Sequence, residues 1–290
     1  MKTSPLFRYF VTVGLFGLMI SPLFGGNSIL LNETFAAGQR LTQNLPTTSA
    51  WYGSSTPTDT TAGEVTFAKG AHLITYFTDM NGANNNPVTL SNIGDKLNIT
   101  FSLSIDSSAA SSFRIGLFDS TGLRANTDAH TVSNSIFEDY TGYAAFITTG
   151  ATSTTGAFNQ RDADKSSKLI NGSDSYAALV TTTNNTGAKI DSGSTYTGTF
   201  SLERTSAGVV LTATINGLEI TATDSTSPYT AFDTFAILGA STLNTVTLKN
   251  VMITYTAIPE PSTSALMIGA ILLGFIACVR AQHFPTSKRQ

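Results

Sequence analysis

The sequence predicts an all-β chain built as a single antiparallel β-sandwich, and three observations support that prediction. Apolar and polar residues alternate with a period of two over much of the chain, as from Leu97 to Ile105, so one face of each strand is expected to be buried and the other wet. Asn216-Gly217 joins two alternating runs and indicates a hairpin, because both central residues of a type I′ turn need positive φ. Between the two chain ends, no segment keeps a 3.6-residue apolar period over three turns.

The same alternation predicts the remaining elements in order. The expected strands are 64–69, 72–77, 97–105, 113–117, 143–148, 176–182, 196–202, 209–215, 218–221, 232–238 and 246–255. In the last of them the polar-apolar phase slips near Asn250, which predicts a β-bulge. Stretches rich in Ser, Thr, Asn and Gly predict loops at 47–63, 82–87, 150–172 and 184–194.

Composition narrows the classes of function that the body of the chain can have. Residues 27–257 carry eleven Lys and Arg against eighteen Asp and Glu, a net charge of −7 with no basic stripe, so nucleic acid is not an expected partner. The one cysteine, Cys278, falls in an apolar run near the C-terminus. The body therefore has no disulfide, thiol nucleophile or zinc-thiolate site.

The C-terminal end has a separate organisation. Pro259-Glu260-Pro261 precedes a fifteen-residue apolar run, 265–279, which ends at Arg280. As a helix, this run would be about 22 Å long, and the preceding small hydroxyl residues extend it to a transmembrane helix at 262–279. The two prolines keep the approach extended. A buried C-terminal helix is the alternative, but the run is apolar on every face rather than along one stripe.

This arrangement resembles the PEP-CTERM sorting signal of exported Gram-negative bacterial proteins, over residues 258–280. The resemblance implies that an exosortase, a membrane processing enzyme, reads Pro259, Glu260 and Pro261, with Arg280 as the start of the basic end. It also implies delivery to the cell surface or to an exopolysaccharide matrix. Arg280 stands alone here, whereas the family usually has an arginine cluster, so a retained membrane anchor is left open.

The N-terminal end predicts the same topology. Lys2 and Arg8 precede an apolar segment at 9–24, as in a secretory signal peptide, which we place at 1–26. An uncleaved signal anchor is the alternative. Positive charge at both ends puts both termini on the cytoplasmic side before processing. The domains expected are thus a signal peptide at 1–26, an exported sandwich at 27–257 and a sorting signal at 258–290.

The number and spacing of the predicted strands favour a sandwich of the jelly-roll kind, with a short barrel as the alternative. In length and strand order the body is similar to concanavalin-like lectins and glucanases. That resemblance concerns architecture and implies the fold.

Catalytic residues are not evident in this sequence. Glucanases of this fold class carry carboxylates at i and i+2 on one strand, whereas Glu138-Asp139 are adjacent and would face opposite ways. Asp162 and Asp164 have the spacing but lie in a polar stretch that reads as a loop. His72 and His130 could serve a lyase, although two histidines in a domain of this size are more often incidental. We therefore expect no enzyme, with a secreted carbohydrate-active hydrolase or lyase as the alternative.

No cofactor is expected, and calcium is the metal to consider. The nearest ligand runs are Asp119-Ser120-Thr121-Gly122 and Asp162-Ala163-Asp164, neither of which matches a full calcium loop. Asp119 is better suited to starting a turn that Gly122 closes.

The function expected is association with extracellular polysaccharide, through loops rather than a deep cleft. Aromatic residues with a polar end suit sugar contact, which makes Trp51 and Tyr52, and then Tyr140 and Tyr143, the candidates. The alternative for Trp51 is that it closes one end of the sandwich core.

Overall fold

The computed structural model describes most of the predicted sandwich. It describes residues 26–36, 40–60, 63–79, 86–106, 111–130, 135–149, 153–163, 167–170, 176–186, 190–239 and 245–258. Apart from Gly26 and Ile258, the predicted signal peptide and sorting signal, including the transmembrane helix at 262–279, lie outside the described residues. Within them, no helix has both the length and the apolar character needed to span a bilayer.

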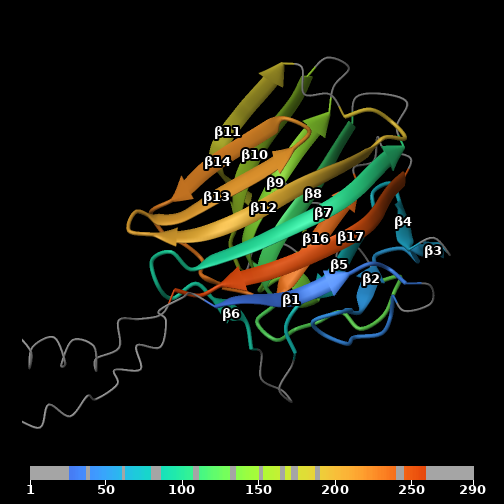
Figure 1. Ribbon diagram of the computed structural model, residues 1–290, viewed down its shortest axis with the longest axis horizontal. Coiled ribbons are helices and arrows are strands. Elements are labelled where there is room, and N and C mark those ends of the chain that lie inside the picture. Colours follow the sequence, from blue (N-terminus) through green and yellow to red (C-terminus); the bar gives the residue numbers. More distant parts are fainter. Residues whose placement is uncertain are drawn as a thin grey trace, which may run out of the picture.

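Two antiparallel sheets form the body of the molecule (Figure 1). The larger has eight strands. In spatial order they are β14 (Leu218–Asp224), β13 (Gly208–Ile215), β12 (Thr195–Thr205), β7 (Lys96–Asp106), β17 (Thr245–Thr256), β4 (Glu64–Ala68) and β3 (Thr58–Thr60), with β1 (Asn27–Glu33) also on β17.

The second sheet has seven strands and lies behind the first in Figure 1. In spatial order they are β11 (Tyr176–Thr186), β10 (Ser153–Arg161), β9 (Thr141–Thr149), β8 (Ser111–Asp119), β16 (Thr234–Gly239), β5 (His72–Tyr76) and β2 (Trp51–Gly53). A short ladder of β15 (Ala231–Phe232) and β6 (Val88–Thr89) and one 3₁₀ turn, η1 (Ser135–Phe137), complete the described elements.

The main core fills the space between the sheets with the apolar half of each alternating strand. Leu97, Ile99, Phe101 and Leu103 of β7 are fully buried there, as are the inward residues of β8. The Phe158 and Phe200 rings stack across the interface with centroids 5.6 Å apart. The all-β sandwich that the alternation predicts is therefore confirmed.

β17 organises the larger sheet. One of its edges pairs with β7 from Thr245 to Thr256. Its other edge is shared, with β4 on Thr245 to Leu248 and β1 on the half that ends at Thr256. The register with β7 shifts between Leu248 and Asn250, which confirms the predicted bulge.

The loop predictions are partly wrong. Residues 47–63 contain β2 and β3, residues 153–161 form β10, and β11 continues to Thr186. The alternation does not predict β10 because this strand carries polar side chains at buried positions. Arg161, for example, has no exposed surface and donates to the carbonyl oxygens of Phe137 and Tyr140.

The predicted hairpin at Asn216-Gly217 is confirmed, with φ values of 46° and 81°. We expect Gly217→Val to lower the free energy of unfolding by about 1–2 kcal/mol, because a β-branched residue is strained at positive φ. Asn216→Gly is the matched control and should change stability by less than about 0.5 kcal/mol, since glycine accepts this backbone freely. Urea unfolding of both variants measures the difference, and equal stabilities would contradict the assigned turn.

Candidate functional site

Trp51 lies in the core and not on the surface. Its side chain is fully buried, and its ring packs against those of Phe35 and Phe235. The indole Nε1 donates to Glu33 Oε2 at 3.1 Å, which satisfies its only polar group. The prediction that Trp51 and Tyr52 form an exposed pair is therefore wrong for Trp51. Trp51 is a core residue, in line with the alternative prediction. Tyr52 is half-buried.

Tyr140 and Tyr143 are also buried, for a different reason. Tyr140 packs edge-on to Phe137 and its hydroxyl contacts Tyr76 Oη at 3.0 Å. Tyr143 points into the main core and donates to Asp224 Oδ2 at 2.8 Å. Burial, then its hydrogen bond to Asp224, raises the pKa of the Tyr143 phenol. As placed, neither ring offers a face for a sugar to stack on.

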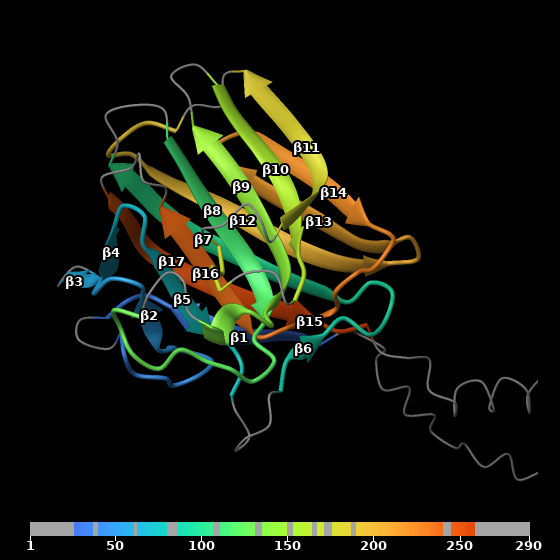
Figure 2. The same cartoon turned by 180° about the vertical axis from the view of Figure 1, so that it is seen from behind.

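Tyr140 is buried because the outer face of the seven-stranded sheet is covered. Segments 119–130, 135–140 and 167–170 lie on that face, as Figure 2 shows for the green segments over its lower part. A second apolar cluster lies beneath them. Its buried members are Ile74, Tyr76, Phe118, Ala125, Phe137, Tyr140, Ala144, Leu169, Ile170, Ala236 and Leu238.

The outer face of the eight-stranded sheet, by contrast, is open. Figure 1 looks onto it, and no described segment crosses in front of β12, β7 and β17. The pairing registers align its outward positions in rows across the strands, and most of these side chains are Thr, Ser or Asn. We call this set the hydroxyl face: Thr66, Asn98, Thr100, Ser102, Ser104, Thr195, Thr197, Thr199, Ser201, Thr212, Thr214, Thr221, Thr223, Thr247, Asn250 and Thr254.

Neighbouring side-chain hydroxyls on this face form hydrogen bonds with one another. Thr199 and Thr214 are 2.7 Å apart at Oγ1, Thr66 and Thr247 are 2.9 Å apart, and Ser102 contacts Thr197 at 3.1 Å. A hydroxyl has one donor and two acceptor positions, so each pair keeps further capacity for a ligand. Mutual hydrogen bonds also restrict the rotamers, which lowers the entropy lost when a ligand binds.

Charge on the hydroxyl face is sparse and largely paired. At its borders, Lys96 lies 3.3 Å from Glu203 and Lys249 lies 2.8 Å from Glu64. Glu219, opposite Thr214, and Asp106, at the end of β7, add negative charge to this face, which therefore suits a polar uncharged ligand better than a polyanion. The sequence signal for this site is the polar half of the alternating strands, for example Asn98, Thr100, Ser102 and Ser104, which by itself predicts only a solvent-exposed face.

The acidic residues considered for catalysis or metal binding have structural roles or point outward. Asp162 Oδ1 accepts a hydrogen bond from the Tyr229 hydroxyl at 3.0 Å, and Asp164 lies outside the described residues. Glu138 and Asp139 are exposed beyond η1. Within the described part of the chain, no group of three or more His, Cys, Asp and Glu residues could hold a metal ion.

Asp119 starts a turn, as predicted. Its Oδ1 accepts from Thr121 N at 2.9 Å, and Thr121 and Gly122 both have positive φ, 53° and 88°. The following Ser120 is buried and donates from both N and Oγ to the Asp233 carboxylate.

The two histidines considered for a lyase are in contact. His72 Nε2 lies 2.8 Å from His130 Nε2, and the His130 Nδ1 lies 3.1 Å from the Thr127 carbonyl oxygen. His72 is fully buried, and its Nδ1 has no hydrogen-bond partner among the described residues. Burial, then the proximity of His130, lowers the pKa of His72 from 6.5 to about 3, so the pair is neutral near pH 7.

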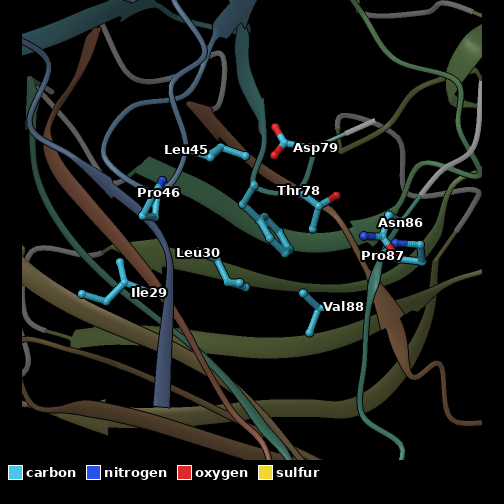
Figure 3. A pocket seen from close by; sticks show the side chains of 10 residues that line it. Ile29, Leu30, Leu45, Pro46, Thr78, Asp79, Asn86, Pro87 and Val88 are labelled. Atoms are coloured by element: carbon cyan, nitrogen blue, oxygen red, sulfur yellow. The ribbon is translucent and has the colours of Figure 1, made fainter. Parts of the chain in front are cut away.

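A cleft of about 370 Å³ lies beside β1 (Figure 3). Ile29, Leu30 and Val88 line its lower side and Thr78 and Asp79 lie opposite. The lining is mostly apolar, with Thr78, Asp79 and Asn86 as its polar members.

The two ends of the described chain leave the sandwich together. Asn27 pairs with Thr256 in the β1–β17 ladder, and Ala257 N donates to the Gly26 carbonyl oxygen at 3.1 Å. Figure 1 shows the start of β1 next to the arrowhead of β17. We call this the terminal end of the sandwich.

No protein-family model and no curated protein matches the sequence. Among solved structures, the metal-free carbohydrate recognition domain of Emp46p has a TM-score of 0.47 at 10% identity, covering 78% of this chain and 94% of that one. A legume lectin-like domain from Entamoeba histolytica gives 0.46 at 10% identity, covering 77% and 96%. An endo-1,3-beta-glucanase from Streptomyces sioyaensis gives 0.45 at 12% identity, covering 80% and 97%.

These similarities concern architecture. It is the two antiparallel sheets of the described residues that agree with the predicted fold class. At such identities no residue's role is transferred from one chain to the other.

The buried histidine pair predicts a loss of stability in mild acid. The unfolded chain takes up a proton on His72 near pH 6.5, whereas the folded chain does so only near pH 3. Stability is therefore full above about pH 6.5 and falls below it, by on the order of 1 kcal/mol per pH unit for one proton. Urea unfolding between about pH 7.5 and 4.5 measures this slope. The double variant His72→Gln/His130→Gln keeps the carboxylates, so an equal slope in that variant would contradict the assignment.

Proposed function

We propose that this chain is an exported, membrane-tethered β-sandwich protein that associates with extracellular polysaccharide without acting on it as an enzyme. The observation that carries the proposal is the hydroxyl face, a broad and open surface of donors and acceptors with few charged side chains. Sugar chains present the same kinds of groups, and an extended chain can meet many such side chains at once. Contact through this sheet face replaces the contact through loop aromatics that the sequence suggested, because three of those four aromatics are buried.

Export and sorting belong to the same proposal. The signal-like segment at 1–26 and the Pro259-Glu260-Pro261 box with its apolar run support passage across the inner membrane and recognition by an exosortase. The protein would then be anchored through its C-terminal helix until it is processed to the cell surface or matrix. The shared exit of both chain ends is compatible with this topology, since both flanking segments can reach one membrane from the terminal end.

Binding is tested with a panel of neutral and anionic polysaccharides, measuring retention and released products. We expect retention on neutral chains, and the variant Thr100→Glu/Thr199→Glu should weaken it about thirtyfold, since two lost hydrogen bonds are worth roughly 1 kcal/mol each and charge is added to the centre of the face. Ser206→Glu/Ala207→Glu is the matched control, because it adds the same charge on an exposed turn away from the face. Reducing sugar or unsaturated ends above background would overturn the non-enzymatic part of the proposal.

Sorting is tested by replacing Pro259, Glu260 and Pro261 with alanine in the organism of origin. We expect the variant to stay in the membrane fraction at full precursor length, because the processing enzyme would no longer recognise it. Mass spectrometry of the C-terminal peptide in membrane and extracellular fractions measures the outcome. A variant that is trimmed and released like the natural chain would show that this box is not the sorting signal.

A further inference from the structure

Exposed aliphatic side chains gather at the terminal end of the sandwich. Ile93 is 65% exposed, the largest fraction among the large apolar side chains of the described residues. Ile29 is 49% exposed and Ile258 is 39% exposed. Single exposed aliphatics are ordinary, but several at one end of a domain indicate a surface that meets an apolar partner.

The turn at 91–95, which carries Ile93, also holds Ile258 in place. Asp95 Oδ1 accepts from Ile258 N at 2.8 Å, and Asn92 Nδ2 donates to the Ile258 carbonyl oxygen at 3.3 Å. A Cβ on Gly94 would come within 2.8 Å of Ile258 Cγ1, so the isoleucine side chain lies directly against the backbone of this turn. The last described residue is therefore fixed to the domain.

Ile29 belongs to the same end of the molecule. It pairs with Thr254, close to the Asn27–Thr256 pair where both chain ends leave. It also lines the cleft of Figure 3, together with Leu30 and Val88, so the aliphatic surface continues into a recess.

Two ionised groups of the 91–95 turn and its border, Asp95 and Lys96, are already paired, whereas the nearby Arg204 has a buried Nη1 with no hydrogen-bond partner among the described residues. Asp95 is fully buried and also accepts from Asn92 N and the Tyr255 hydroxyl. Lys96 is paired with Glu203 at 3.3 Å. An apolar partner could approach this turn without removing the charges of Asp95 and Lys96 from their partners.

The length of chain beyond Ile258 indicates that the apolar partner of this surface is the lipid bilayer. Six residues, 259–264, separate it from the apolar run 265–279, and six residues span at most about 20 Å when fully extended. If that run lies in lipid, the terminal end of the sandwich is held within this distance of the bilayer. Tethering at such short range gives a high effective concentration, so a few partly exposed isoleucines suffice for contact.

We propose that the terminal end of the sandwich rests on the bilayer surface while the chain is anchored, with Ile93 in the interfacial layer. The inference rests on the anchoring in the proposed function. In this arrangement the long axis of β17 points away from the membrane. Ala68, which pairs with Thr245 at the other end of β17, would lie roughly 36 Å from the terminal end, at 3.3 Å per residue.

The single cysteine makes a direct test possible. The full chain is reconstituted in phosphatidylcholine vesicles with a nitroxide-bearing lipid, and a thiol-linked fluorophore is placed at one of three sites. The first is the native Cys278 in the apolar run. The other two are Ile93→Cys and the matched control Ala68→Cys, both in a Cys278→Ala background. Both replaced side chains are exposed, so neither change disturbs the core.

We expect strong quenching at Cys278, and quenching at position 93 about threefold greater than at position 68. Equal, weak quenching at 93 and 68 with strong quenching at Cys278 would overturn the inference while leaving the anchor intact. Weak quenching at Cys278 itself would instead overturn the anchoring and the inference with it.

Discussion

The pairing of β17 is the constraint on which the rest of this structure depends. Its full length bonds to β7, and its other edge is divided between β4 and β1, with the bulge before Asn250 at the division. Because β1 comes from the beginning of the domain and β17 from its end, closing the larger sheet also joins the two ends of the chain. The shape of the sheet, the position of its outward rows and the shared exit of the termini are thus consequences of one strand's neighbours.

The two sheets share a core but differ in what lies on their outer faces. On the seven-stranded sheet, Arg161 donates to the carbonyl oxygens of Phe137 and Tyr140 and so fixes a covering segment over a second apolar cluster. On the eight-stranded sheet the outward side chains are hydroxyls and amides that need no cover. A ligand therefore has access to one broad sheet face, and the polarity of that face limits which ligands it suits.

Sequence reasoning succeeded where a strand has one wet and one buried face. The strands at 97–105 and 209–215, the Asn216-Gly217 turn and the bulge near Asn250 were all predicted from local alternation or local turn chemistry. β10 was not, because Arg161 is polar yet buried, a state that depends on carbonyl groups of a neighbouring segment. Trp51 was placed wrongly for a similar reason: its acceptor, Glu33, lies eighteen residues away and gives no local signal.

The sequence predicts the exposure of the hydroxyl-face residues but not their alignment across the sheet. The members of this face were expected to be solvent-exposed, but their alignment into rows depends on the registers among β4, β17, β7, β12, β13 and β14, which join distant parts of the chain.

The 3.1 Å hydrogen bond between Gly26 and Ala257 has another implication. A sandwich whose entry and exit coincide can be inserted into a surface loop of another protein without separating the halves of that loop, and its own ends can be joined and reopened elsewhere. The fold is in that sense a transferable module.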